Sequence, residues 1–105
     1  MLVGKSLDAA TATGAGAAIF TDVPETAASA QVSFTGGPSA LVVRLEATLD
    51  GVNWQQSGDL FDLSGGDSSG KLVGTTFAPF VGLRANITTL SGGSSPTVTI
   101  WVGAA

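Results

Sequence analysis

Cysteine and histidine are both absent from this sequence of 105 residues. The missing cysteines exclude disulfides, thiolate metal sites and cysteine nucleophiles. The missing histidines remove the commonest general base and a common zinc ligand, and they leave the serines without the base that a catalytic triad needs. We therefore expect a non-enzymatic protein with no catalytic residues, no cofactor and no metal site.

Charged residues are scarce as well. They make up 11% of the chain, less than half of the roughly 25% found in ordinary soluble domains. The basic residues are Lys5, Arg44, Lys71 and Arg84, too few for the basic cluster that neutralises phosphates, so we expect no nucleic-acid partner. No apolar run approaches the roughly 18 residues of a membrane span. Residues 1–20 do not resemble a signal peptide, and we expect no membrane partner.

Small neutral residues take the place of charge. Ser and Thr together number 23, and Gly and Ala number 15 each. A free monomer usually stays soluble through mixed surface charges, whereas the core of an interface is depleted of charge. The composition therefore favours a chain that packs against neighbours over a monomer that Ser and Thr alone keep soluble.

Apolar and polar residues alternate along most of the chain, which is typical of half-buried strands. The clearest strand spans 41–50, and an Asp50-Gly51 turn then leads to a return strand at 53–56, with Trp54 expected in the core. The inner face of the first strand is formed by Leu41, Val43, Leu45, Ala47 and Leu49. Further strands are predicted at 17–20, 29–35, 59–63, 71–77, 81–88 and 97–102.

About seven or eight short strands, separated by Gly- and Ser-rich turns, predict an all-β fold. We expect an antiparallel β-sandwich or jelly roll over residues 17–105, as a single domain. Residues 1–16 contain few large apolar side chains and are expected to form an extended N-terminal arm or an edge strand. Residues 23–28 allow one helical turn at most.

Two groups of carboxylates are candidates for chemistry. Asp59, Asp62 and Asp67 offer the oxygen ligands that Ca²⁺ prefers, but their spacing matches neither an EF-hand nor the nonapeptide calcium repeat. Glu46 and Asp50 form a pair of the kind that glycosidases use, but no pocket is predicted around them. We interpret the first group as solvated loop aspartates and the second as a structural pair.

The last strand places Trp101 outward, on the face opposite its apolar residues and together with Thr97 and Thr99. Tryptophan is enriched at protein interfaces, so we predict that these three residues form a subunit interface. Two alternatives stay open at this point. The ring is half-covered by neighbouring side chains of the sheet, or it is a platform for a sugar ring.

Two stretches resemble small β-sandwich proteins of tailed-phage virions. Leu45-Glu46-Ala47-Thr48-Leu49-Asp50-Gly51-Val52-Asn53-Trp54 is similar to their "L-E-G-S-x-D-G-x-x-W" hairpin, a form of which also occurs in discoidin-like jelly rolls. Residues 80–88 with 97–100 are similar to the "Y-V-R-A-N-I/V-T … T-V-T" close of the same phage proteins. Discoidin domains are longer and usually have a disulfide, so the phage proteins are the better match.

The resemblance implies a virion structural protein, assembled in the host cytoplasm, and carries over no catalytic or ligand-binding residue. We expect a capsid decoration or auxiliary protein whose partners are the major capsid protein, other virion proteins and copies of itself. The alternatives are a tail, neck or fibre component, and a carbohydrate-binding β-sandwich module.

Overall fold

Strands make up most of the computed structural model, which describes residues 2–105. Within this range there is no α-helix, and the predicted all-β antiparallel fold is confirmed. The elements in chain order are β1 (Leu2–Ala10), β2 (Gly14–Ala15), β3 (Ile19–Thr35), β4 (Ala40–Thr48), β5 (Gln55–Gln56), β6 (Phe61–Asp62), the 3-10 turn η1 (Leu63–Gly65), β7 (Lys71–Ser91) and β8 (Thr97–Ala104).

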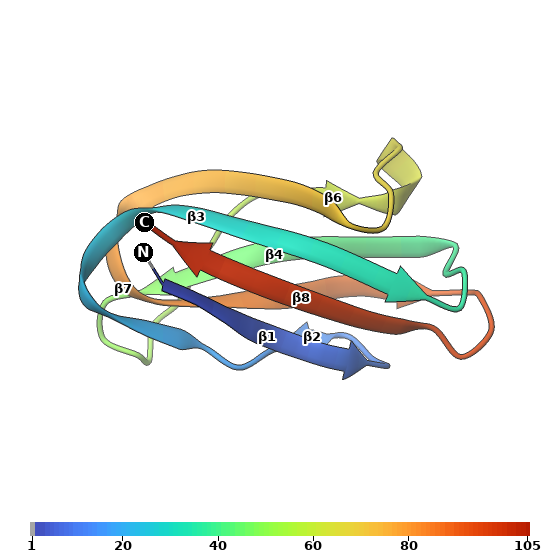
Figure 1. Cartoon of the computed structure of the whole chain (residues 1–105), viewed down its shortest axis with the longest axis horizontal. Coiled ribbons are helices and arrows are strands. Elements are labelled where there is room, and N and C mark those ends of the chain that lie inside the picture. The colour runs from blue at the N-terminus through green and yellow to red at the C-terminus, as the bar shows by residue number, and fades with distance from the viewer. Residues whose placement is uncertain (1) are drawn as a thin grey trace.

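The strands belong to one eight-stranded antiparallel sheet (Figure 1). Its strand order is β1-β8-β3-β7-β4-β5, with β2 paired to β7 and β6 paired to β4. The hairpin expected after Asp50-Gly51 is present as β4 and β5, although the return strand has only two residues. β1 lies at the edge of the sheet beside β8, with registers from Leu2↔Ala104 to Ala10↔Val98.

The sheet forms two layers because β3 and β7 each run through both of them. Residues 27–32 of β3 pair with 71–76 of β7 in the first layer, which also contains β1 and β8. Residues 19–20 of β3 pair with 82–83 of β7 in the second layer, which also contains β2, β4, β5 and β6. The long strands therefore connect the two layers of the sandwich.

Both long strands bend between these two blocks of pairing, where their register shifts. Pro24 of β3 and Pro79 of β7 lie in the bends. Proline has no N–H to donate to a ladder, so it is tolerated where regular pairing is interrupted. The sequence allowed one helical turn at residues 23–28, and that prediction is wrong because these residues belong to β3. We call this end of the molecule, at the left of Figure 1, the bend end; the loop of residues 49–54 also lies there.

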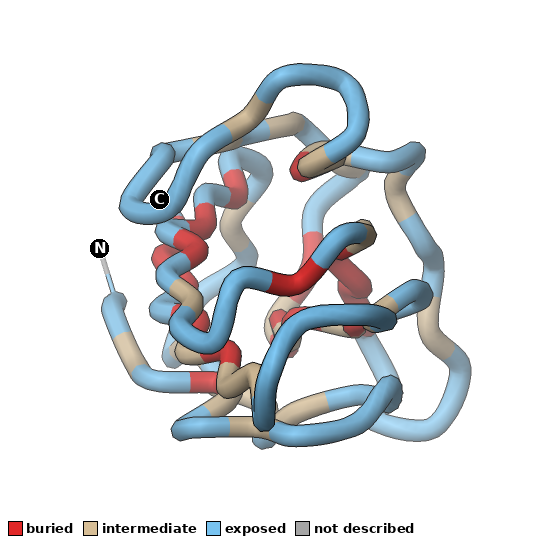
Figure 2. The backbone as a smooth tube through the Cα atoms, turned by 90° about the vertical axis from the view of Figure 1, so that its right-hand side faces the viewer, coloured by how far each residue is buried: buried red, intermediate tan, exposed pale blue. Residues whose placement is uncertain are grey.

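The hydrophobic core lies between the two layers and follows the predicted alternation (Figure 2). Each fully buried Val, Leu, Ile or Phe stabilises the fold by about 1.5–3 kcal/mol relative to an exposed one. The prediction that Leu49 faces the core is wrong, because β4 ends at Thr48 and the chain turns before Leu49 can point inward. The largest buried side chains are Val32, Leu41, Val43, Leu45, Phe61, Phe80, Leu83, Ile87, Val98, Ile100 and Val102.

Candidate functional site

A row of four side chains crosses the outer surface of the first layer. Lys5 of β1 and Gln31 of β3 both lie opposite Trp101 of β8, and Leu72 of β7 lies opposite Gln31. Because paired residues of a sheet point to the same side, these four side chains share the outer face. Trp101 is 45% exposed, as expected for the outward position that the sequence predicts.

The two predicted threonines lie on the same face, but their hydroxyl groups are used within the chain. The hydroxyls of Thr97 and Thr35 are 2.6 Å apart and share a hydrogen bond. The Thr99 hydroxyl accepts a hydrogen bond of 3.1 Å from the backbone N–H of Ala9. Trp101 is therefore the predicted site residue with the most surface to offer a partner.

This surface, which we call the Trp101 face, is nearly free of charge. Its charged member is Lys5, whose ammonium lies 5.2 Å from the centre of the Trp101 ring and 3.6 Å from the carboxylate of Asp8. The face consists of Val3, Lys5, Ser29, Gln31, Ser33, Thr35, Leu72, Gly74, Thr76, Thr97, Thr99, Trp101 and Gly103. Small neutral side chains surround an exposed aromatic, an arrangement that suits packing against another protein.

The outer surface of the second layer is different, because it contains a buried ion pair. Glu46 of β4 lies opposite Arg84 of β7 and opposite Gln56 of β5. The Glu46 carboxylate accepts hydrogen bonds of 2.7 Å from Arg84 Nε, 2.7 Å from Gln56 Nε2 and 3.4 Å from Asn86 Nδ2. Burial alone would raise the pKa of Glu46, but these hydrogen bonds and the charge of Arg84 lower it. Glu46 is therefore an ionised structural group.

Trp54 completes this network, and its predicted place in the core is wrong. The register Ala47↔Gln55 puts Trp54 on the same side of the hairpin as Thr48, which is the outer side. The half-buried indole lies against the guanidinium of Arg84, 4.0 Å from the ring centre. Cation–π stacking with Arg84 therefore replaces the core packing that the sequence suggested.

Asp50 organises the β4–β5 loop from within. Its carboxylate accepts hydrogen bonds of 2.8 Å from the backbone N–H groups of Val52 and Asn53 and from the Asn53 side chain. These bonds hold the pKa of Asp50 well below its usual range. Gly51 has a φ of 78°, a conformation that glycine adopts without strain. Asp50 thus has a structural role that explains the Asp-Gly pair at this turn.

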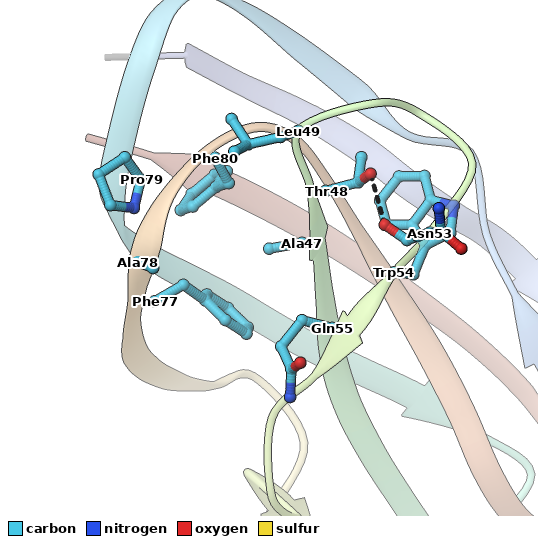
Figure 3. Close-up of a pocket in the computed structure, with 10 residues that line it drawn as sticks. All are labelled: Ala47, Thr48, Leu49, Asn53, Trp54, Gln55, Phe77, Ala78, Pro79 and Phe80. Atoms are coloured by element: carbon cyan, nitrogen blue, oxygen red, sulfur yellow. Dashed lines mark hydrogen bonds between the residues drawn. The ribbon is translucent and has the colours of Figure 1, made fainter.

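A cleft of about 340 Å³ lies at the bend end, between the β4–β5 loop and the bend of β7 (Figure 3). Phe77 and Phe80 of β7 pack edge to face, with their ring centres 5.8 Å apart, and line the cleft together with Ala47 of β4. No carboxylate lines this cleft, so the pair Glu46 and Asp50 is not placed for acid–base chemistry there. The lining residues are Ala47, Thr48, Leu49, Asn53, Trp54, Gln55, Phe77, Ala78, Pro79 and Phe80. Sequence reasoning missed the cleft because its two walls come from distant segments.

The three loop aspartates have separate partners. Asp59 accepts a 2.6 Å hydrogen bond from Arg44, and Asp67 forms an ion pair with Lys71. Asp62 caps η1 by accepting a hydrogen bond from a backbone N–H. Among residues 2–105 no three metal-ligating side chains come together. The same part of the chain contains no helix that is long and apolar enough to span a membrane.

Comparison with known proteins gives a likeness in structure and none in sequence. No protein-family model matches the chain, and no curated protein matches it in sequence. The crystal structure of the SPBc2 prophage-derived protein YomS matches with a TM-score of 0.58 and 9% sequence identity. The match covers 100% of this chain and 96% of YomS. This chain therefore has the same overall fold as a prophage-derived protein of similar length.

Proposed function

We propose that this chain is a non-enzymatic structural protein of a tailed-phage virion, specifically a capsid decoration or auxiliary protein that binds and stabilises the head shell. The observation that carries the proposal is the Trp101 face, a four-stranded and nearly uncharged surface with an exposed tryptophan in its central row. Weak contacts through such a face become strong when symmetry repeats them around a particle.

Two further observations support a phage origin. The hairpin around Asp50-Gly51 and the segments 80–88 and 97–100 resemble small virion β-sandwich proteins. The YomS structure, from a prophage, has the same fold over the whole chain. Neither observation distinguishes the head from the tail, so that assignment needs the copy number in the particle.

The decisive measurement is the amount of this chain per virus particle. Particles from the source culture are banded on a density gradient, and the chain is quantified against the major shell protein by mass spectrometry. We expect on the order of hundreds of copies, as the symmetry of a shell requires. A count nearer to a dozen would assign the chain to the tail or neck, and its absence from the band would refute the virion proposal.

In this proposal the Trp101 face contacts a second copy of the chain. Replacing Trp101 with alanine is expected to weaken self-association at least about tenfold, because exposed tryptophans are common interface hot spots. The control is Thr89→Ala, which shortens an exposed side chain on the second layer and is expected to have no effect. Analytical ultracentrifugation of the two variants measures the difference, and equal association constants would contradict the role of Trp101.

A carbohydrate-binding module is the second candidate, since the Trp101 indole is accessible. The ammonium of Lys5 lies over the ring, however, and competes with a sugar for the same surface. Retention on immobilised glycans, lost in Trp101→Ala while self-association is unchanged, would favour this candidate.

A further inference from the structure

Exposed apolar side chains are concentrated at the bend end. Eight large hydrophobic residues of the described chain are exposed, and five of them lie around the bend of β3 and in the β4–β5 loop. They form what we call the bend-end patch: Leu2, Phe20, Val23, Leu49 and Val52. Contiguous apolar surface of this kind marks interaction sites on soluble proteins.

Three segments far apart in the sequence meet around Phe20. Phe20 pairs with Gly82, which has no side chain, so the ring lies over the backbone of β7. A Cβ atom added to Gly51 of the β4–β5 loop would lie 4.0 Å from the Phe20 ring. Phe20 also lines a hollow of about 240 Å³ with Leu2 and Val23. The patch therefore runs from β1 across the bend of β3 to the tip of the loop.

The same end carries most of the net charge of the molecule. The four basic residues all form ion pairs, with Asp8, Asp59, Asp67 and Glu46. Four of the eight acidic residues therefore lack a Lys or Arg partner within residues 2–105, which accounts for the net charge of −4. These residues are Asp22, Glu25, Asp50 and Asp62.

Three of these four carboxylates belong to the bend end. Asp22 and Glu25 line the hollow beside Phe20 and Val23. Asp50 is the residue between Leu49 and Gly51 in the loop. The patch is thus an apolar surface with negative charges around it and no unpaired cation among the described residues.

We propose that the bend-end patch is a docking surface for a protein surface of opposite character, apolar at its centre and rich in Lys and Arg around it. This inference rests on the proposed function and assigns that surface to the shell protein. A second copy docking patch to patch would bring like charges together, which disfavours self-association here. Nucleic acid and anionic lipid would be repelled for the same reason.

Rebinding to particles tests this assignment. The probe is the full-length, fluorescently labelled chain added to particles assembled without it, and the bound amount is measured over a range of chain concentrations. Val52→Asp places a charge at the loop end of the patch, at a side chain that is 78% exposed and not needed for packing. We expect its affinity to fall at least about tenfold, because the new charge is desolvated in the complex.

The matched control is Thr89→Asp, because Thr and Val have nearly the same shape and Thr89 is exposed on the second layer. It should bind as the unmodified chain does, and urea unfolding should show that both variants remain folded. A second pair tests the charges: Asp22→Asn should weaken binding and reduce its dependence on NaCl, whereas Asp59→Asn should change neither.

The possible outcomes separate the two proposals. If the unmodified chain binds and Val52→Asp binds equally well, the docking surface is wrong and the shell-binding function stands. If Val52→Asp changes only the oligomeric mass in solution, the patch joins copies of the chain and the inference is likewise overturned. If the unmodified chain binds no particle, both the proposed function and this inference are refuted.

Discussion

Replacing Arg84 with methionine probes how much the second layer depends on its buried ion pair. Arg84 Nε and Glu46 Oε1 are 2.7 Å apart, and the Glu46 side chain is only 5% exposed. A second ion pair on the same face, Arg44 with Asp59, is 2.6 Å long, but 45% of the Asp59 side chain is exposed. Arg44→Met therefore removes the same charge from the same surface with much less burial, and serves as the control.

The expected cost follows from the difference in burial. Removing one partner of a buried pair costs about 3–5 kcal/mol, because the other charge stays buried without its partner. Arg84 keeps some contact with solvent and Glu46 keeps its bonds to Gln56 and Asn86, so we expect about 2–3 kcal/mol for Arg84→Met. An exposed pair is worth about 0–1 kcal/mol, so Arg44→Met should cost no more than that.

The dependence of stability on pH should change as well. The pKa of Glu46 lies below its ordinary value of 4.5, so its contribution is present above that pH and is lost as the pH falls through the folded-state pKa. Arg84→Met removes both a hydrogen bond and a positive charge, which raises the pKa of Glu46. The variant should therefore lose less stability on acidification than the unmodified chain.

Urea unfolding at neutral and acidic pH measures both effects. The double variant Glu46→Gln with Arg84→Met should recover part of the lost stability, because a neutral amide replaces the unpaired carboxylate. The reasoning would be refuted if Arg84→Met cost no more than Arg44→Met at neutral pH. It would also fail if Arg84→Met and the unmodified chain showed the same loss of stability in acid.

Two further predictions concern the bend end. A Cβ atom at Gly82 would lie 2.7 Å from the side chain of Thr48, so Gly82→Val should cost about 1–3 kcal/mol in urea unfolding. Gly58→Val, where nothing lies within 4 Å, should have little effect, and equal costs would contradict this packing. Asp50→Ala removes the acceptor of the N–H groups of residues 52–53, so NMR should show faster hydrogen exchange of these two amides. Unchanged exchange rates would mean that the carboxylate does not hold the loop.

The alternation of side chains predicted the core well because it is a local property. A strand directs successive side chains to opposite faces, so Leu41, Val43 and Leu45 were placed inward without any knowledge of their partners. The same logic placed Trp101 outward on β8. The alternation failed at Leu49, where β4 ends, and at residues 23–28, where β3 contains a proline and bends.

By itself, then, the amino-acid sequence determined the all-β class, most of the core and, because it lacks Cys, the exclusion of disulfides. Only the tertiary structure decided which strands share a layer and in which register they pair. Pairing, not alternation, put Trp54 on Arg84 and Glu46 beside Gln56. The folding of β3 and β7 also brought Phe20 next to the β4–β5 loop, some thirty residues away along the chain. Alternation cannot predict such contacts, because it records the face of a side chain and carries no information about its cross-strand neighbour.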